Sequence, residues 1–435
     1  MEISRQGWLE VAVRGAVVLC AGWLVSSLVA GADRLGPLAP VPDWSALERF
    51  QGTITRAEFE RLLERVYGPG GAARAFISVG EEGAVVRGED GRVRLTLRFA
   101  RSAETAAPVS RYWRAASELG PAPDGKPLDG LRVAIDPGHI GGKWARIEER
   151  WFQIGDDAPV MEGDMAMVVA RHLRARLEAM GGKVLMVRDR SEPVTRRRPK
   201  DLGREAREWL AERGVTRPKQ GYSGPEDPAK AATVDWNAEL LFYRVSEIRA
   251  RADKVNRQLR PDVTLCLHFN AEDWGDPARP TLVDANHLHL LLNGRYGADE
   301  LRYEDQQFDL LLKLLGRSWS EELAISKAVA DSMARVTGLP PYTYAGGNAI
   351  RAGGNPYLWV RNLLANRLYQ CPVIYVEPYV MNSRDAYARV QAGDYDGVRE
   401  IRGKKRESIF REYARGVAEG LAAYCRAARA GTNVR

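Results

Sequence analysis

Two histidines in this chain follow short apolar runs in the same way. Residues 131–135 are mostly apolar and lead into Asp-Pro-Gly-His, so that His139 comes just after the run breaks. Residues 262–267 form a similar run that leads to His268. Such runs, bounded by turn residues, predict buried strands, and open α/β sheets bind ligands at the carboxyl ends of their strands. We therefore expect both imidazoles at one edge of a sheet.

A carboxylate follows a third apolar run. Residues 373–376 lead directly to Glu377, which is followed by Pro378. Catalytic zinc takes three protein ligands, commonly histidine and carboxylate, and leaves one position for water. Histidine, histidine and glutamate at equivalent strand ends therefore indicate a metal-dependent hydrolase.

The third metal ligand should be a carboxylate on an element beside the first strand. Glu162 fits best, because it begins a predicted helix whose apolar residues recur on one face over residues 165–177. The helix dipole also favours a carboxylate in the first turn. Glu148 and Glu149, in the loop after His139, stay open as alternatives.

Hydrolysis of an amide needs a group that takes a proton from water and hands it to the leaving nitrogen. A positioned carboxylate does this, while bound zinc lowers the pKa of water towards ~7. We predict this proton-transfer role for Glu377. Asp136 either orients a ligand imidazole or only shapes the turn before His139.

The other histidines fit other roles. His172 lies well inside the predicted helix, where we expect a surface or helix-packing residue. His287 and His289 share one face of the predicted strand at residues 286–292. We favour a solvated sheet face for this pair over contact with a substrate.

From residue 131 onward, predicted strands alternate with predicted helices. The helices cover residues 165–177, 325–336 and 410–424, and a further strand covers residues 183–188. Alternation of this kind predicts an α/β fold with a mostly parallel sheet flanked by helices. We assign residues 131–430 to this catalytic domain.

A smaller unit precedes this domain. Residues 33–107 read as a small α+β domain of unknown role, with a capping box at Thr55 and Glu58 and an alternating strand at residues 93–99. Residues 108–130 are rich in proline and glycine towards their end and read as a linker.

The amino end has the composition of a targeting segment. Arg5 and Arg14 precede a charge-free apolar stretch over residues 16–32 that ends in small residues. These parts are typical of a secretory signal, and the stretch is also just long enough for a membrane anchor. We predict that residues 1–32 are a signal peptide or an anchor, and that the remaining chain is secreted or periplasmic. Contact with a membrane is expected only through this segment, if it stays uncleaved.

Composition narrows the class of partner. Among 435 residues, 45% are hydrophobic and 28% are charged, which is ordinary for a globular protein. The net charge of +7 comes without a basic cluster interleaved with aromatics, which argues against a nucleic-acid partner. It would suit weak, non-specific attraction to an anionic polymer.

Cysteine usage does not indicate a disulfide framework. Cys266, Cys371 and Cys425 are an odd and sparse set beyond the amino-terminal segment. Cys266 should pack as a small apolar group beside His268. A bridge between Cys266 and Cys371 stays open.

Long stretches interrupt the alternation of strands and helices. We expect insertions near residues 190–243 and 293–320, and a further irregular stretch at residues 342–368. Insertions of this length are either lids and binding loops or surface decoration.

Residues 131–425 resemble the zinc-dependent N-acetylmuramoyl-L-alanine amidases of the type-3 family. The resemblance lies in short motifs that occur in the family's order: Asp-Pro-Gly-His-Ile-Gly-Gly at 136–142, Glu162 opening a helix, Arg188 ending a strand, Arg251 five residues before Asn256, Cys-Leu-His-Phe-Asn-Ala at 266–271, and Glu377 ending a late strand. The chain departs from the family in three places. The gap between His139 and Glu162 is longer, Cys266 stands where the family has serine, and the residues that follow Glu377 differ from those of the family.

The resemblance implies a central sheet of about six strands and a zinc enzyme. It implies Zn²⁺ on His139, Glu162 and His268, with Glu377 as the catalytic residue. It adds four residues with roles around the ligands or towards the substrate: Asp136, Arg251, Asn256 and Asn270. The implied reaction is hydrolysis of the amide between N-acetylmuramic acid and L-alanine of the peptidoglycan stem peptide, in cell-wall remodelling or daughter-cell separation.

Relatives in this family can block the zinc with an inserted helix. This makes residues 190–243 a candidate autoinhibitory lid, and it makes an activator protein a candidate partner beside peptidoglycan. The alternatives are another zinc peptidase acting on stem peptides, and a wall-binding or scaffold protein with an inactive metal site. A zinc carboxypeptidase is disfavoured, because it would have glutamate where this chain has Gly142.

Overall fold

The computed structural model describes residues 34–277 and 279–430. The predicted signal peptide or anchor at residues 1–32 lies outside the described residues. Among the described helices, none combines the length and the apolar character needed to cross a membrane.

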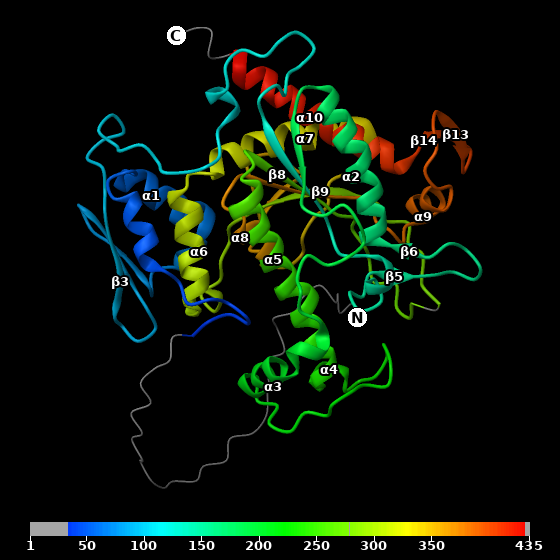
Figure 1. Ribbon diagram of the computed structural model, residues 1–435, viewed down its shortest axis with the longest axis horizontal. Coiled ribbons are helices and arrows are strands. Elements are labelled where there is room, and N and C mark those ends of the chain that lie inside the picture. Colours follow the sequence, from blue (N-terminus) through cyan, green and yellow to red (C-terminus); the bar gives the residue numbers. More distant parts are fainter. Residues whose placement is uncertain (1–33, 278, 431–435) are drawn as a thin grey trace.

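A seven-stranded sheet lies at the centre of the molecule (Figure 1), in the order β10-β11-β9-β12-β8-β4-β7. The strands are β4 (Arg132–Pro137), β7 (Lys183–Met186), β8 (Val263–Leu267), β9 (Leu288–Leu292), β10 (Ile350–Arg351), β11 (Leu358–Val360) and β12 (Val373–Pro378). The predicted α/β class is confirmed. The expected number of about six strands is exceeded because the irregular stretch at residues 342–368 supplies two short strands, β10 and β11.

Strand direction changes once in the middle of the sheet. Strands β7, β4, β8 and β12 are parallel to one another. Strand β9 is antiparallel to β12, and β11 is parallel to β9. Edge strand β10 is antiparallel to β11. As a result, β9 begins at the edge where β8 and β12 end, and His289 lies opposite Glu377 in the register.

Helices cover both faces of the sheet. One face packs on α2 (Glu162–Ala179), α7 (Trp319–Thr337) and α10 (Ile409–Ala430), which confirms the three predicted helices. It buries alternate strand residues such as Val133, Leu265 and Val376 in the main core. The opposite face buries Ala134 and Cys266 against α5 (Glu247–Asp253) and α8 (Leu364–Leu368).

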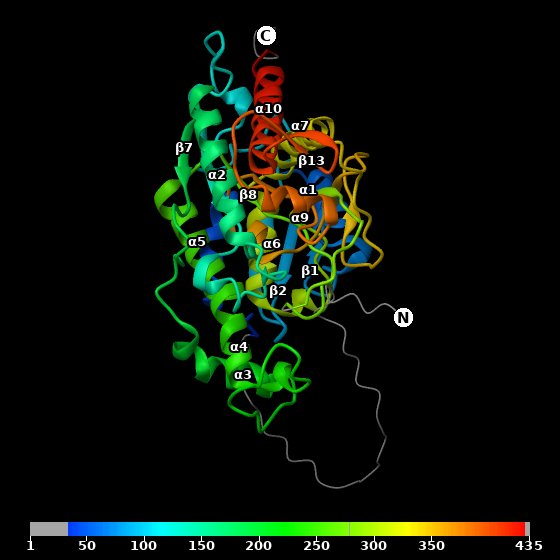
Figure 2. The same ribbon diagram turned by 90° about the vertical axis from the view of Figure 1, so that its right-hand side faces the viewer.

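A long, nearly continuous helix leads into β8. It consists of α4 (Val234–Leu240), a π-type stretch at Leu241–Ser246, α5, and a second π-type stretch at Lys254–Leu259. Its first half packs with α3 (Gly203–Glu212) around a separate small core that contains Leu210 and Phe242. Both views show α3 and α4 at one end of the molecule, away from the sheet (Figures 1 and 2). This region contains most of the 190–243 segment, whereas Ser191, at the start of the segment, contacts Asp164 in the first turn of α2.

The first described unit is a three-stranded antiparallel sheet with one helix. Its strands are β1 (Ile77–Val79), β2 (Gly83–Arg87) and β3 (Val93–Arg98), beside α1 (Arg56–Leu62). The Thr55 half of the predicted capping box is present, because the Thr55 hydroxyl accepts a hydrogen bond from the Glu58 amide at 3.3 Å. Shorter helical turns at Trp44–Phe50, Leu63–Tyr67 and Pro69–Gly71 complete the unit.

Helix α6 (Glu304–Leu315), from the 293–320 segment, packs on this first unit. Arg94 on β3 donates to Glu304 at 2.6 Å, and Arg302 pairs with Glu89 at 3.0 Å. Figure 1 shows α6 beside α1. The segment therefore connects the first unit to the central sheet.

The remaining described elements are short. A hairpin of β5 (Trp151–Phe152) and β6 (Val160–Met161) leads into α2. Helix α9 (Arg384–Gln391) and the hairpin of β13 (Val398–Ile401) and β14 (Lys404–Glu407) lie between β12 and α10 (Figure 2). Isolated 3-10 turns occur at Ala116–Glu118, Gly142–Trp144, Pro199–Leu202, Lys230–Ala232 and Glu300–Arg302.

The described cysteines are buried and form no disulfide. Cys266 is 1% exposed and packs in the second core, as predicted. The open alternative of a bridge to Cys371 is wrong. The Cys371 thiol instead lies 3.1 Å from the hydroxyl of Thr264.

Candidate metal centre

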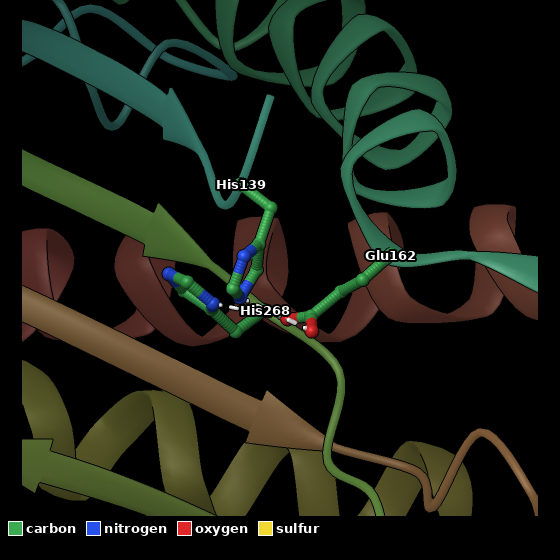
Figure 3. A group of neighbouring side chains, drawn as sticks. All are labelled: His139, Glu162 and His268. Carbon is green, nitrogen blue, oxygen red and sulfur yellow. Dashed lines mark hydrogen bonds and ion pairs between the residues drawn. The ribbon is translucent and has the colours of Figure 1, made fainter. Parts of the chain in front are cut away.

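His139, Glu162 and His268 converge at the carboxyl-terminal edge of the sheet (Figure 3). They come from the loop after β4, the first residue of α2 and the loop after β8. Each offers one ligand atom, and these atoms lie within 4.8 Å of one another. Glu162 bridges the two rings, with Oε2 at 3.2 Å from His139 Nε2 and Oε1 at 3.0 Å from His268 Nδ1.

Two close approaches explain the glycines of this loop. A Cβ at Gly138 would lie 2.5 Å from the His268 ring, so only glycine lets the ring lie against the strand end. A Cβ at Gly163 would lie 2.4 Å from the Gly141 amide nitrogen. Because the β4 loop and α2 touch through their backbones, Glu162 is brought directly against His139.

Two buried arginines hold the same loop by hydrogen bonds to its carbonyl groups. Arg188 donates to the carbonyls of Gly138 at 3.0 Å and Ile140 at 3.1 Å. Arg251 donates to the carbonyl of His139 at 2.8 Å. These bonds satisfy carbonyl groups that are buried in an irregular segment, and they set the direction in which His139 points.

Asp136 contacts Arg251 rather than an imidazole. Its Oδ1 lies 2.9 Å from Arg251 Nη1, and its Oδ2 accepts from the Tyr369 hydroxyl. Burial lowers the pKa of Arg251, but Asp136 and Glu247 outweigh it and raise the pKa. Asp136 therefore acts on His139 through Arg251, by anchoring the guanidinium that holds the loop.

The alternative carboxylates lie outside the three-residue cluster. Glu148 accepts from the amides of Ile140 at 2.8 Å and Gly141 at 3.0 Å, and its Oε1 lies 3.5 Å from His139 Nδ1. Glu148 therefore lies on the Nδ1 side of the His139 ring, whereas Glu162 lies on the Nε2 side. Glu149 turns away and binds Lys230.

The charge state of the cluster suits a divalent metal. Burial holds the pKa of the His139 imidazole well below its usual value, so its nitrogen lone pair is free for a metal. Burial raises the pKa of Glu162, but the two imidazoles and Arg150 outweigh this effect and lower it. Two imidazoles and one carboxylate are a donor set typical of catalytic zinc. The His268 ring is further fixed by stacking on Tyr375, with ring centroids 4.4 Å apart.

Arg150 is a functional candidate that the sequence analysis missed. Its Nε lies 3.1 Å from Glu162 Oε2, the oxygen that also faces His139. Arg150 comes from the loop that connects the histidine motif to α2, a stretch with no motif of its own. Only the fold of this loop could have pointed to it.

Glu377 ends β12, directly beside the strand that carries His268. The His268 amide donates to the carbonyl of Val376 at 3.0 Å, which fixes the two strand ends relative to each other. Burial raises the pKa of Glu377, but His289, His268 and Arg361 outweigh it and lower the pKa to about 2. The carboxylate is therefore ionised at neutral pH.

The prediction of a solvated face for His287 and His289 is wrong. His289 is 1% exposed and His287 is 7% exposed. The ring of Tyr342 covers both imidazoles, at 4.5 Å from His287 and 5.0 Å from His289, and the antiparallel direction of β9 brings them to the edge where Glu377 lies. His289 Nε2 lies 3.2 Å from Glu377 Oε2 and 3.0 Å from the Tyr344 hydroxyl.

The structure separates the remaining predicted residues. Asn270 lies with the histidine pair, its Nδ2 at 3.2 Å from His287 Nδ1. Asn256 donates instead to the carbonyl of Leu368 at 2.9 Å and accepts from Gln370, before β12 begins. His172 pairs with Asp394 at 2.9 Å and is partly exposed, in line with a surface or helix-packing role.

Comparisons with known proteins give distant structural similarities only. No family model and no curated protein matches the chain. The N-acetylmuramyl-L-alanine amidase Ami1 from Mycobacterium smegmatis is similar over 69% of this chain and 99% of its own, with 17% identity and a TM-score of 0.36. The CwlD amidase from Clostridioides difficile, solved with the GerS lipoprotein, covers 68% of this chain and 100% of its own, at 12% identity and a TM-score of 0.35. The amidase AmiC2 of Nostoc punctiforme covers 68% of this chain and 99% of its own, at 16% identity and a TM-score of 0.34. Similarity at this level is too distant to carry a function, which we argue from the residues of the site.

Proposed function

We propose that this protein is a zinc-dependent N-acetylmuramoyl-L-alanine amidase. The observation that carries the proposal is the convergence of His139, Glu162 and His268 beside the ionised carboxylate of Glu377. A metal-ligand set with an adjacent proton acceptor is what hydrolysis of an unactivated amide requires. The substrate, the amide between N-acetylmuramic acid and L-alanine, follows from the resemblance of the motifs to the type-3 amidases.

The three ligands and Glu377 have distinct roles in this proposal. His139, Glu162 and His268 would hold Zn²⁺, which supplies Lewis acidity towards a water and towards the scissile carbonyl. Glu377 accepts the proton that the attacking water loses, and then delivers it to the leaving nitrogen. A carboxylate that is ionised at neutral pH can begin this cycle without first losing a proton.

Residues behind the ligands keep this geometry in place. Glu148 accepts backbone bonds from the loop beside His139, and Arg251 joins Asp136 to the His139 carbonyl. Outer partners of this kind fix ligand orientation and typically change metal affinity about 10–100-fold when removed. Asn270, at the other end of the site, contacts His289, the histidine beside Glu377, at 3.5 Å.

The 190–243 segment is proposed to control access to the metal. Lys230 binds Glu149 at 2.7 Å, next to Arg150, which itself binds Glu162. The segment is thus connected to a loop that touches a metal ligand. Deleting it should raise basal activity, and unchanged basal activity would contradict a role as a lid. An activator protein would act by moving the same loop.

The proposed substrate also sets the expected location. Peptidoglycan lies outside the cytoplasmic membrane, so we propose that the protein is secreted or periplasmic, directed there by residues 1–32. Fractionation of cells that express the full chain should recover it from the periplasm or medium, or from the membrane if the segment stays uncleaved. Recovery in the cytoplasm would contradict this location.

The test is digestion of purified peptidoglycan by the zinc-loaded chain, with and without a chelator, followed by mass spectrometry. Chelator-sensitive release of intact stem peptides with free L-alanine amino ends is the expected result, and Glu377→Gln is the matched inactive control. Cleavage elsewhere in the stem would identify a different zinc peptidase. If the chain binds peptidoglycan but does not cleave it, even after removal of residues 190–243, the alternative of a wall-binding protein would be supported.

A further inference from the structure

We propose that His289, in a tautomer selected by Asn270, positions the carboxylate of Glu377 for proton transfer. This inference rests on the proposed function, because it assigns a partner to the proposed proton acceptor. The contacts that carry it are side-chain contacts between β9, β12 and the loop after β8.

His289 is buried against the carboxylate of Glu377. Its Nε2 lies 3.2 Å from Glu377 Oε2, and the ring is 1% exposed. The phenol of Tyr344 shares this nitrogen at 3.0 Å, and the ring of Tyr342 packs 5.0 Å away. Arg361 lies over the Tyr344 ring, 5.7 Å from its centroid.

The orientation of the Asn270 amide decides which nitrogen of His289 carries hydrogen. Asn270 Oδ1 accepts from the Ala271 amide at 2.8 Å, so the Nδ2 group must point the other way. There it faces Nδ1 of His287 at 3.2 Å and Nδ1 of His289 at 3.5 Å. An amide nitrogen only donates, so both Nδ1 atoms must accept. Both rings then carry their hydrogen on Nε2.

With hydrogen on Nε2, His289 offers its N–H to Glu377 Oε2 at 3.2 Å and shares it with the Tyr344 hydroxyl at 3.0 Å. The contact with Glu377 engages one carboxylate oxygen and stabilises the ionised form, so Oε1 is left to accept a proton from water. The opposite tautomer would present a lone pair to a carboxylate and repel it. Asn270 therefore fixes the tautomer of His289 by donating to its Nδ1. Hydrogen-bond partners of metal-bound histidines fix the tautomer of those rings in the same way.

His287 offers a matched control on the same strand. It is held by the same Asn270 amide, but its Nε2 faces Glu272 Oε1 at 3.3 Å. Glu272 lies at the rim of the site, with a side chain that is 42% exposed. His287 thus has the same kind of surroundings as His289 without a contact to Glu377.

The kinetic test compares His289→Leu, His289→Gln and His287→Leu in the full zinc-loaded chain. We expect His289→Leu to lower kcat roughly 10–100-fold with KM and zinc content unchanged. Glutamine retains an N–H donor and should restore most of kcat, while His287→Leu should stay within about threefold of wild type. Equal loss in the leucine and glutamine variants would mean a packing role and overturn the proposal.

A second readout does not depend on activity. The chain has 5 histidines, so ¹⁵N-histidine labelling of the metal-free protein gives an assignable spectrum. We expect a protonated Nε2 and an unprotonated Nδ1 for His289 at neutral pH. The opposite tautomer would overturn the proposal even if the protein is an active amidase. If the protein instead fails to cleave peptidoglycan, the proposed function fails, and the tautomer still tests the Asn270–His289 arrangement.

Discussion

The carboxyl-terminal edge of the central sheet has two halves that are built differently. In the metal half, His139 and His268 follow the parallel strands β4 and β8, and backbone contacts fix them: Gly163 against Gly141, and arginine side chains on loop carbonyls. In the proton-transfer half, Glu377 ends β12 while His289 begins the antiparallel strand β9. There, side chains fix one another through hydrogen bonds.

Because of this difference, the two halves should tolerate different substitutions. Backbone contacts leave little freedom in residue type, so the metal half depends on glycines and on buried charges that bind the main chain. Side-chain hydrogen bonds can be removed one at a time without moving the loops. Substitutions in the metal half should therefore affect metal content, whereas those in the other half should affect turnover alone.

The largest expected effect comes from removing a ligand in the metal half. Glu162→Ala takes away the bridging carboxylate and leaves His139 and His268 without their common partner. Zinc affinity should fall by more than the roughly 10–100-fold that follows loss of an outer partner, and activity should fall with it. Metal analysis after dialysis measures this directly. Retained zinc would mean that Glu162 is not a ligand, and it would favour Glu148 as the third ligand.

The next effect isolates the proton-transfer half. Glu377→Gln keeps the shape of the side chain and its neighbours but removes the proton acceptor. We expect kcat to fall about 10²–10⁴-fold with zinc content equal to that of wild type. Zinc loss in this variant would show that the roles of Glu377 and Glu162 had been exchanged.

The same contrast explains what could be predicted from the sequence. Parallel strands end at one edge, so an apolar run followed by His139 or His268 already indicates where the side chain lies. The direction of β9 is set by its neighbours in the sheet, and the run around His289 looks the same whichever way it points, so the edge at which His289 lies could not be predicted. The burial of His287 and His289 comes from Tyr342, which belongs to a stretch without a predicted regular structure.

Two more residues show where short motifs stop being informative. The spacing from Arg251 predicts a role in the site for Asn256, yet its side chain, in the π-type stretch after α5, bonds the loop before β12. Arg150 lies in a loop without any pattern, and its contact with Glu162 depends on how that loop folds back through β5 and β6. Positions of this kind are decided by tertiary packing.

Acid stability gives a smaller effect that is specific to the proton-transfer half. The pKa of Glu377 is lowered to about 2 in the folded protein, against ~4.3 in an unfolded chain. Its stabilising contribution is therefore complete above ~4.3 and is lost as the pH falls towards 2. In metal-free protein, wild type should lose roughly 3 kcal/mol more than Glu377→Gln over this range. Urea titrations at several pH values measure the difference, and a gap that does not change with pH would contradict the pairing with His289.

The smallest effect probes the residue that links the metal half to the 190–243 segment. Arg150 places a guanidinium on Glu162 Oε2 at 3.1 Å, so its charge opposes a divalent ion at the same carboxylate. Even at a high effective dielectric, such repulsion is worth about 1–2 kcal/mol. Arg150→Ala should therefore tighten zinc binding roughly tenfold, as competition with a chromophoric chelator would measure. Weaker binding would show that Arg150 orients Glu162 for the metal, and that the loop assists the centre instead of restraining it.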